Sequence, residues 1–341
     1  RKVASDIIPS ENLLNLEVQY NKMQIFKRSY QSYLLIGMLM LILFFIQIFT
    51  SQNTKLIKLM TIGRKVLFYL LIGVFIFHGS GLIIRWQVSG HVPWSNGYEA
   101  VVFIAWITML AGFIFSRKNA VVVAGTAVLA SLMIFVTELN LLDPEITPLV
   151  PVLKSYWLMI HVAVITGSYG FLGLACILGL LNLILYVFRT PKNGKLITAN
   201  ITELTYVSEM TMTIGVFMLT IGTFLGGIWA NESWGRYWGW DPKETWALVS
   251  VLVYATILHL RFIPGLKSKF VFNLVSFWGY SAILFTFFGV NFILVGLHSY
   301  AQGGDGLGDF PSWISYTIIA FLAFSVLAYW RNKTYKNLKA N

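Results

Sequence analysis

Residues 156–188 read YWLMIHVAVITGSYGFLGLACILGLLNLILYVF and contain no charged side chain. A helix needs about 20 apolar residues to cross the hydrocarbon layer of a membrane, so this run predicts a transmembrane helix that tilts or projects beyond the bilayer. Of the 341 residues in the chain, 57% are apolar and 11% are charged, too apolar a composition for a soluble domain of this size. We therefore expect an all-α, polytopic membrane protein.

Further apolar runs on both sides of this segment predict a helical bundle with about nine transmembrane helices. The predicted spans are residues 32–50, 66–86, 98–116, 120–138, 156–188, 211–228, 245–262, 271–297 and 312–330. A polar segment, residues 1–30, precedes the first span, and we expect it to be the end of a larger region. Residues 31–341 then form the transmembrane domain.

The distribution of positive charge predicts the orientation of the bundle. The net charge of +11 is concentrated in alternate connections, and basic connections mark the cytoplasmic side of a membrane protein. The basic segments are residues 51–65, 117–118, 189–195, 261–269 and the tail from residue 331. We expect the N-terminus outside and the C-terminus in the cytoplasm, although Lys27 and Arg28 go against this pattern. The positive charge therefore indicates orientation, not binding to nucleic acid.

A tryptophan-rich segment separates two of the predicted spans on the outer side. Residues 229–246 read WANESWGRYWGWDPKETW and contain five of the 12 tryptophans of the chain. At a membrane surface, such a segment would form a flat aromatic shelf, with Arg and Lys side chains available for polar substituents. The ligand that suits this shelf is a large, planar, apolar molecule with charged substituents, and haem fits that description.

Two of the five histidines lie at the depth of this segment. His161 is about one and a half turns inside the outer end of the span 156–188, and His298 closes the span 271–297 at the same side. Two neutral imidazoles on opposite faces of a macrocycle are a common axial pair for haem iron. The alternative is that these histidines only hydrogen-bond lipid headgroups or loop carbonyls.

The other three histidines lie elsewhere along the predicted bundle. His259, two residues before Arg261, is expected near the cytoplasmic face, about 20 Å from the outer site. It would belong to a second, inner haem whose other ligand lies on another polypeptide. His78 is either a structural residue or a weaker candidate ligand. His91 follows the second span and is expected to pack or hydrogen-bond, while Trp94, with Tyr98 and Arg85, is a candidate wall of the outer site.

The run WGRYWGWDPKETW at residues 234–246 resembles the WWD motif of haem-handling membrane proteins. Together with the loop at residues 89–99 and the flanking histidines, it is similar to the CcsA (ResC) family, over nearly the whole chain from about residue 60. This family is the membrane core of the system II cytochrome c synthase. The resemblance implies that His161 and His298 hold the outer haem iron and that His259 holds an inner one.

The resemblance also implies an activity and its partners. Haem b, coordinated by two histidines, would cross the bacterial cytoplasmic membrane and be joined by thioether bonds to the CxxCH motif of an apocytochrome c at the outer face. The chain would act as a cytochrome c synthase of the haem lyase type. Its partners would be membrane lipid, apocytochrome c and a CcsB (ResB)-like protein, which supplies the second inner ligand. Some members fuse CcsB ahead of CcsA, which suits the polar start of this chain.

The residues of the WWD motif have different expected roles. The rings of Trp234, Trp238, Trp240 and Trp246 would stack on the macrocycle and leave its vinyl edge exposed. Arg236, with Lys243, would bind the haem propionates through charge-assisted hydrogen bonds. Asp241 is either an acid in the reaction or the cap of a helix that begins at the following proline, and we favour the cap. No nucleophile on this chain is needed.

Two other classes of function remain open at this stage. The first is a haem exporter or chaperone that passes haem on without ligation. The second is a transmembrane electron carrier of the cytochrome b type, which would have paired histidines at matched depths inside the hydrocarbon. Covalent haem on a co-expressed apocytochrome would distinguish a synthase from both.

Overall fold

The computed structural model describes residues 10–49, 54–116, 119–139, 141–149, 153–294, 296 and 312–340, and this part of the chain contains no β-strand. The α-helices are α2 (Glu11–Met23), α3 (Ile25–Phe49), α4 (Thr54–Ser89), α5 (Gly97–Phe115), α6 (Ala120–Thr137), α7 (Tyr156–Phe188), α8 (Gly194–Trp234), α9 (Pro242–His259), α10 (Lys269–Leu284), α11 (Val290–Phe292) and α12 (Ser312–Ala340). A 3-10 turn at Leu260–Phe262 follows α9, and a π-helical segment at Phe285–Gly289 joins α10 to α11.

Within the described ranges, nine helical segments are long and apolar enough to cross a membrane. The predicted all-α bundle with about nine spans is therefore confirmed. Several helices extend beyond the predicted spans: for example, 211–228 lies within α8, Gly194–Trp234, and 66–86 lies within α4, Thr54–Ser89. Hydropathy detects only the part of a helix suited to hydrocarbon, whereas the helix continues through polar residues until a breaking residue stops it.

The described part of the predicted polar segment, residues 1–30, contains α2 and the start of α3. Its last residues belong to α3, which begins at Ile25. Gln24 separates α2 from α3 with a φ of 44°, a left-handed conformation that interrupts the helix. The division of the chain at residue 30 stays a prediction.

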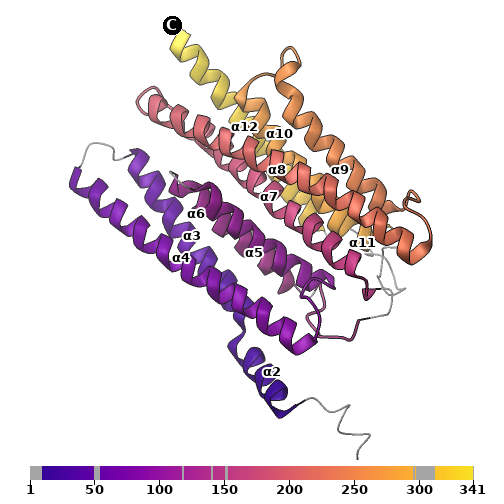
Figure 1. The fold of residues 1–341 in the computed structure, drawn as a ribbon. Helices are drawn as coiled ribbons and strands as arrows, with labels where there is room; N and C mark the ends of the chain where they lie inside the picture. Colours follow the sequence, from indigo (N-terminus) through magenta and orange to yellow (C-terminus); the bar gives the residue numbers. More distant parts are fainter. Residues whose placement is uncertain are drawn as a thin grey trace, which may run out of the picture.

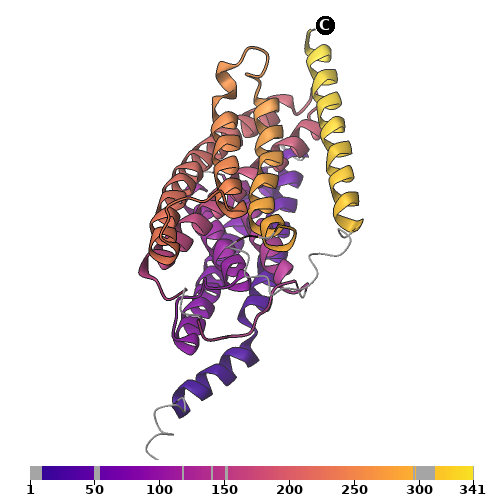
Figure 2. The ribbon, with the colours of Figure 1, turned by 90° about the vertical axis from the view of Figure 1, so that its right-hand side faces the viewer.

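Helix α7 lies at the centre of the bundle. It packs along α8 and also contacts α5, α6, α10 and α12. Small residues permit these close approaches: a Cβ at Gly179 would lie 2.7 Å from the backbone oxygen of Asn273, and one at Gly170 would lie 3.0 Å from the backbone nitrogen of Thr108. By contrast, α12 lies at the periphery of the bundle (Figure 2). Only 11% of the residues in its apolar 18-residue stretch are buried.

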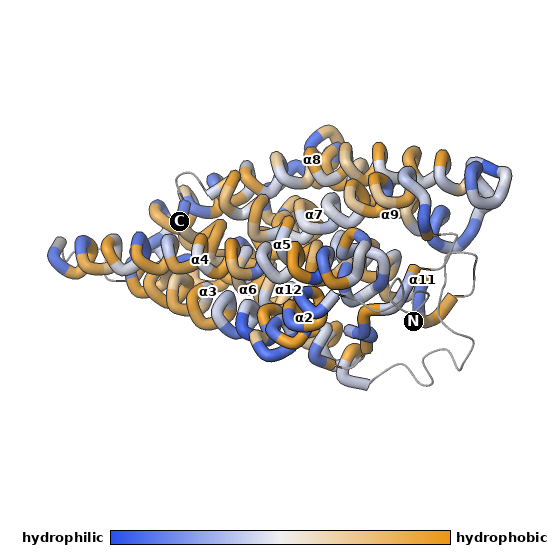
Figure 3. The backbone as a smooth tube through the Cα atoms, turned by 60° about the horizontal axis from the view of Figure 1, so that its bottom comes forward, coloured by the Kyte–Doolittle hydropathy of each residue, from blue (hydrophilic) through white to orange (hydrophobic). Residues whose placement is uncertain are grey.

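The connections between helices alternate between the two ends of the bundle (Figure 1). The α4–α5 connection, α2 and the α8–α9 connection lie at one end; we call the α8–α9 connection the Trp loop and this end the Trp-loop end. The α7–α8 and α9–α10 connections and the C-terminus lie at the other, which we call the C-terminal end. Hydrophilic residues gather towards these ends and hydrophobic residues between them (Figure 3), as expected for a membrane-spanning bundle. Which end faces the cytoplasm stays a prediction.

Candidate functional site

The α8–α9 connection at the Trp-loop end is a short turn with both ends capped. Helix α8 stops at Gly235, whose φ of 70° is easily adopted by glycine and whose N–H donates to the Asn231 carbonyl. Helix α9 starts with Asp241 as its N-cap, Pro242 at the first position and Glu244 completing a capping box. The predicted cap at Asp241 is thus confirmed, and the capping contacts hold the loop in one conformation.

Glu244 organises the polar side of this loop, a role that our reading of the sequence missed. Its Oε2 accepts hydrogen bonds from the backbone N–H groups of Gly239 at 2.7 Å and Asp241 at 3.2 Å. Its Oε1 pairs with Arg236 Nη1 at 3.3 Å. A side chain at Gly239 would overlap the Arg236 guanidinium, which lies across that backbone. The spacing of an Asp and a Glu three residues apart before an apolar run could have revealed Glu244.

The tryptophans of the segment do not form the flat shelf that we predicted. Trp229 is 1% exposed and meets Trp234 edge to face, with rings inclined at 63°. Trp238 and Trp240 are nearly perpendicular, at 89°. Edge-to-face contact is favoured by the aromatic quadrupole, so neighbouring indoles turn away from a common plane.

Two tryptophans of the loop differ sharply in their surroundings. Trp246, in the second turn of α9, packs against Phe285 of the π-helical segment, with ring centroids 4.1 Å apart. Trp240 is 70% exposed and has a φ of 59°, an unfavourable conformation for a residue with a side chain. The loop therefore holds an indole outside the protein surface at a cost in backbone energy, which points to a ligand or partner at this position.

His161 lies against α8 beside the tryptophan-rich segment. Its ring is nearly parallel to that of Trp229, at 9° and a centroid distance of 6.4 Å. Its Nδ1 is 2.7 Å from the Gly222 carbonyl oxygen, which can only accept a hydrogen bond, so Nδ1 carries the proton. The lone pair then resides on Nε2, as in histidines that bind metal through Nε2. The predicted proximity of His161 to the segment is confirmed.

His298 lies outside the described residues, so its pairing with His161 stays a prediction. Gly296, which the structure describes, does reach the α8–α9 connection. A Cβ at Gly296 would lie 2.5 Å from Asp241 Oδ1, and Lys243 Nζ donates to Asn291 Oδ1 at 2.9 Å. The end of the α10–α11 unit therefore packs against the start of α9.

His259 lies at the other end of α9, about 25 Å from the loop along the helix axis. The expected separation was about 20 Å, and His259 does lie at the opposite end of α9 from the α8–α9 connection. The side chain is exposed, and Nδ1 is 2.7 Å from the Ala255 carbonyl oxygen, which again places the proton on Nδ1. The Phe262 ring lies beside it at 5.9 Å.

His78 and Trp94 belong to a different part of the bundle from His161. His78 is fully buried, with Nδ1 3.4 Å from the Tyr33 hydroxyl and its ring edge-on to Phe26 at 5.6 Å. Trp94 packs on Phe103, with ring centroids 4.8 Å apart. Trp94 packs against the buried apolar cluster of α3 to α6, and the His78 partners Tyr33 and Phe26 belong to that cluster. These contacts favour the structural interpretation of His78, whereas the place of Trp94 in a wall of the outer site stays a prediction.

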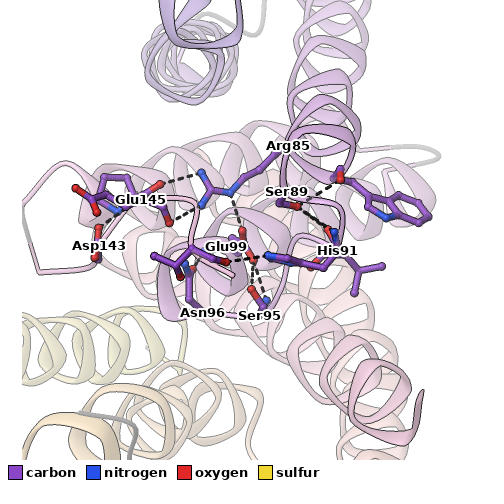
Figure 4. A network of polar contacts seen from close by, with 12 residues as sticks. Arg85, Ser89, His91, Ser95, Asn96, Glu99, Asp143 and Glu145 are labelled. Carbon is purple, nitrogen blue, oxygen red and sulfur yellow. Dashed lines mark hydrogen bonds and ion pairs between the residues drawn. The ribbon is translucent and has the colours of Figure 1, made fainter. Parts of the chain in front are cut away.

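Arg85, which we also expected to line the outer site, is the centre of a closed network (Figure 4). Its Nε pairs with Glu99 Oε1 at 2.7 Å, and the two side chains are 2% and 1% exposed. Its other nitrogens donate to the carbonyls of Pro144 at 3.0 Å and Glu145 at 3.3 Å. The guanidinium also lies 5.0 Å from the Tyr98 ring. A buried guanidinium without partners would be costly, so Arg85 favours the conformation in which these carbonyls lie beside it. The contacts thereby hold the segment that leads towards α7.

His91 also contacts the segment that leads towards α7. Its Nε2 lies 3.4 Å from the Thr147 carbonyl oxygen, and its Nδ1 lies 3.2 Å from that of Val92. The predicted hydrogen-bonding role of His91 is confirmed.

Residues 94–298 match the family described as cytochrome C assembly protein. The chain belongs to this family. The matched residues include the α8–α9 connection and span the positions of His161, His259 and His298. The resemblance to the CcsA family inferred from the WWD motif is therefore confirmed.

Relatives of this cytochrome c assembly chain differ in length. It is 44% identical over 303 residues to protein NrfI of Wolinella succinogenes, an alignment that covers 89% of this chain and 33% of NrfI. It is 37% identical to the cytochrome c biogenesis protein CcsA of Synechococcus sp. strain CC9902, covering 64% of this chain and 81% of that protein. The CcsA of Chlamydomonas reinhardtii is 38% identical, covering 64% of each chain. This chain thus spans about a third of NrfI but most of the cyanobacterial CcsA.

Proposed function

We propose that this chain acts in cytochrome c maturation by binding haem at the Trp-loop end and presenting it for covalent attachment to an apocytochrome c. The observation that carries the proposal is the setting of His161. Its Nδ1 is held by the Gly222 carbonyl, which orients the ring and leaves Nε2 as the basic atom. Such an imidazole suits haem iron, and the exposed indole of Trp240 lies in the loop that follows α8.

The second axial ligand in this proposal is His298. The position of Gly296, two residues earlier, against Asp241 at the start of α9 supports this choice. Coordination by two histidines also keeps oxygen from the iron while the substrate is held. The histidine of the CxxCH motif would then replace one of the two ligands.

Among the candidate propionate partners, the structure favours Arg236 over Lys243. The Arg236 guanidinium uses one nitrogen for Glu244 and is 31% exposed, so further N–H groups are available for a carboxylate. Lys243 donates instead to Asn291. Glu244 has a positioning role, because it holds both the guanidinium and the backbone of the loop.

The covalent step needs no nucleophile from this chain. A cysteine S–H of the apocytochrome adds across a vinyl C=C bond of haem: sulfur bonds to one carbon and hydrogen to the other, with no net oxidation. The contribution of the protein is to hold the vinyl edge near the thiols, which raises their effective concentration. In this proposal, the chain is a cytochrome c synthase of the haem lyase type, with haem b as its substrate.

Haem would reach this site from the opposite side of the bilayer through His259. The exposure of His259 at the end of α9 allows a second ligand to approach from another polypeptide, such as a CcsB-like partner. With the positive-rich C-terminal end in the cytoplasm, the Trp-loop end lies at the outer face of the bacterial cytoplasmic membrane. This arrangement separates haem uptake from ligation by the length of α9.

The visible spectrum of the purified protein tests the proposal. His161→Ala should lose the low-spin spectrum of outer haem and abolish covalent haem on a co-expressed apocytochrome, and added imidazole should partly restore both. His91→Ala is the matched control, because His91 lies at the same end and its ring nitrogens lie near the backbone carbonyls of Val92 and Thr147. A wild-type spectrum and normal maturation in His161→Ala would refute the proposal.

A further inference from the structure

A pocket of about 500 Å³ is lined by residues at the C-terminal end of the bundle, the end opposite to the Trp loop (Figure 1). It lies where α7, α8, α10 and α12 meet. Its lining residues include the cations Arg189, Lys269 and Lys336 and the aromatic residues Tyr186 and Tyr335, but no carboxylate. Three cations without an acid favour an anionic ligand.

Arg189 is the buried cation of this pocket. It follows the last residue of α7, is 8% exposed and donates from Nη2 to Asn332 Oδ1 at 2.6 Å. Its guanidinium carbon lies 4.0 Å from the Tyr335 ring and 4.9 Å from the Tyr186 ring. Its Nε makes no hydrogen bond, and no carboxylate in the described part of the chain lies within ion-pair distance.

A buried guanidinium without an anion is costly, because the protein replaces water around the charge without neutralising it. Burial lowers the pKa of Arg189, the direction expected for a cation that lacks an acidic partner. An anion in the pocket would remove this cost.

The backbone around the pocket favours an anion as well. Helix α10 begins at Lys269, with Ser268 as its N-cap, and both residues line the pocket. The first N–H groups of a helix lack partners within the helix, and its dipole is positive at this end. The Lys269 ammonium donates to the Thr202 hydroxyl at 2.9 Å, so its position is fixed by a neutral group. Buried Arg189 and the start of α10 therefore both provide positive potential in the same pocket.

We propose that this pocket binds the phosphate of an anionic phospholipid. The pocket lies at the end of apolar spans, and the neighbouring α12 side chains Tyr329 and Trp330 are 55% and 66% exposed, as expected for residues facing lipid near the membrane surface. In the predicted orientation this end faces the cytoplasm, where basic residues near the membrane are attracted to anionic headgroups. The phosphate would connect Arg189 after α7, Lys269 of α10 and Lys336 of α12, and so fasten the peripheral helix to the bundle.

Native mass spectrometry of delipidated protein, titrated with phosphatidylglycerol or phosphatidylcholine, tests this site. Arg189→Gln should bind phosphatidylglycerol about tenfold more weakly, since a charged hydrogen bond is lost. Lys336→Gln should weaken binding several-fold without disturbing the fold, because Lys336 is exposed. Lys192→Gln is the matched control: it removes a charge at the same end of the bundle, but its exposed side chain does not line the pocket.

The outcomes separate the possible sources of the anion. Selective retention of phosphatidylglycerol by the wild type and by Lys192→Gln, with weaker retention by both pocket variants, supports the proposal. Displacement of the lipid by millimolar inorganic phosphate would identify a site for free phosphate and overturn the lipid assignment. Equal retention of both lipids, or equal affinity of wild type and Lys336→Gln, would overturn it too. None of these results depends on haem binding.

Discussion

Gly226→Ala provides a graded test of the haem site because it moves His161 without removing it. A Cβ at Gly226 would lie 2.6 Å from His161 Cε1 and 2.8 Å from Nδ1. For the new Cβ and His161 Cε1 to lie 3.4 Å apart, an ordinary van der Waals contact, the imidazole must shift by about 0.8 Å. The Nδ1 hydrogen bond to Gly222, now 2.7 Å, would then be stretched or broken.

The magnitude follows from the loss of that hydrogen bond. A neutral hydrogen bond contributes about 1 kcal/mol, and loss of the group that orients a metal-ligating histidine typically costs about 10- to 100-fold in affinity for the metal. We therefore expect Gly226→Ala to lower haem affinity about 10- to 100-fold while the protein remains folded. Haem titration of the detergent-solubilised protein, followed at the Soret band, measures this change.

Gly73→Ala is the matched control. Gly73 is also in a membrane-spanning helix, but a Cβ there meets nothing within 4 Å. The Gly73→Ala variant should bind haem as the wild type does. Unchanged haem affinity and an unchanged ligand spectrum in Gly226→Ala would show that the position of the His161 ring against α8 does not matter for haem, and the reasoning would fail.

Three further predictions concern the loop and the buried ion pair. Trp240→Gly should relieve left-handed backbone strain and raise the free energy of unfolding by about 1 kcal/mol, as measured by thermal unfolding. It should nevertheless lower haem occupancy, because the exposed indole is lost. A lower free energy of unfolding would contradict the proposed strain. Glu244→Ala should destabilise the loop by about 2 kcal/mol and reduce haem occupancy, whereas Glu244→Gln should retain most of the stability, as measured by thermal unfolding. Arg85→Met should lower the free energy of unfolding by about 3–5 kcal/mol, because it leaves the buried Glu99 carboxylate without its ion-pair partner. Arg261→Met, at an exposed pair, should lower it by about 0–1 kcal/mol. Equal effects of the two variants on thermal unfolding would refute the role of burial.

Composition and local spacing predict the parts of this molecule that depend on short-range physics. The apolar runs predict the spans because hydrocarbon requires them, and Asp241 followed by Pro242 predicts the start of α9 because capping is local. The opposite ends of α9 likewise separate the Trp loop from His259 by simple helix geometry.

The contacts between distant segments could not be read from the sequence. Arg85 looked like an outer-site residue because of its depth, but its partners Glu99 and Pro144 come from other segments and enclose it. The prediction of a flat aromatic shelf was wrong for a similar reason, since the tilt of each indole depends on the rings that it contacts. Sequence gives the depth of a side chain in the membrane, but not the direction in which it points.

The π-helical segment Phe285–Gly289 changes how the residues after it face the rest of the protein. Each π turn contains one residue more than an α turn, so the chain beyond it is rotated by about 100° from where an unbroken α-helix would place it. Asn291, which accepts the hydrogen bond from Lys243, lies beyond this insertion. Deleting one residue from the segment would leave α10 apolar and long enough, yet Asn291 would face away from α9. The register of this helix, more than its composition, therefore connects α10 to the Trp loop.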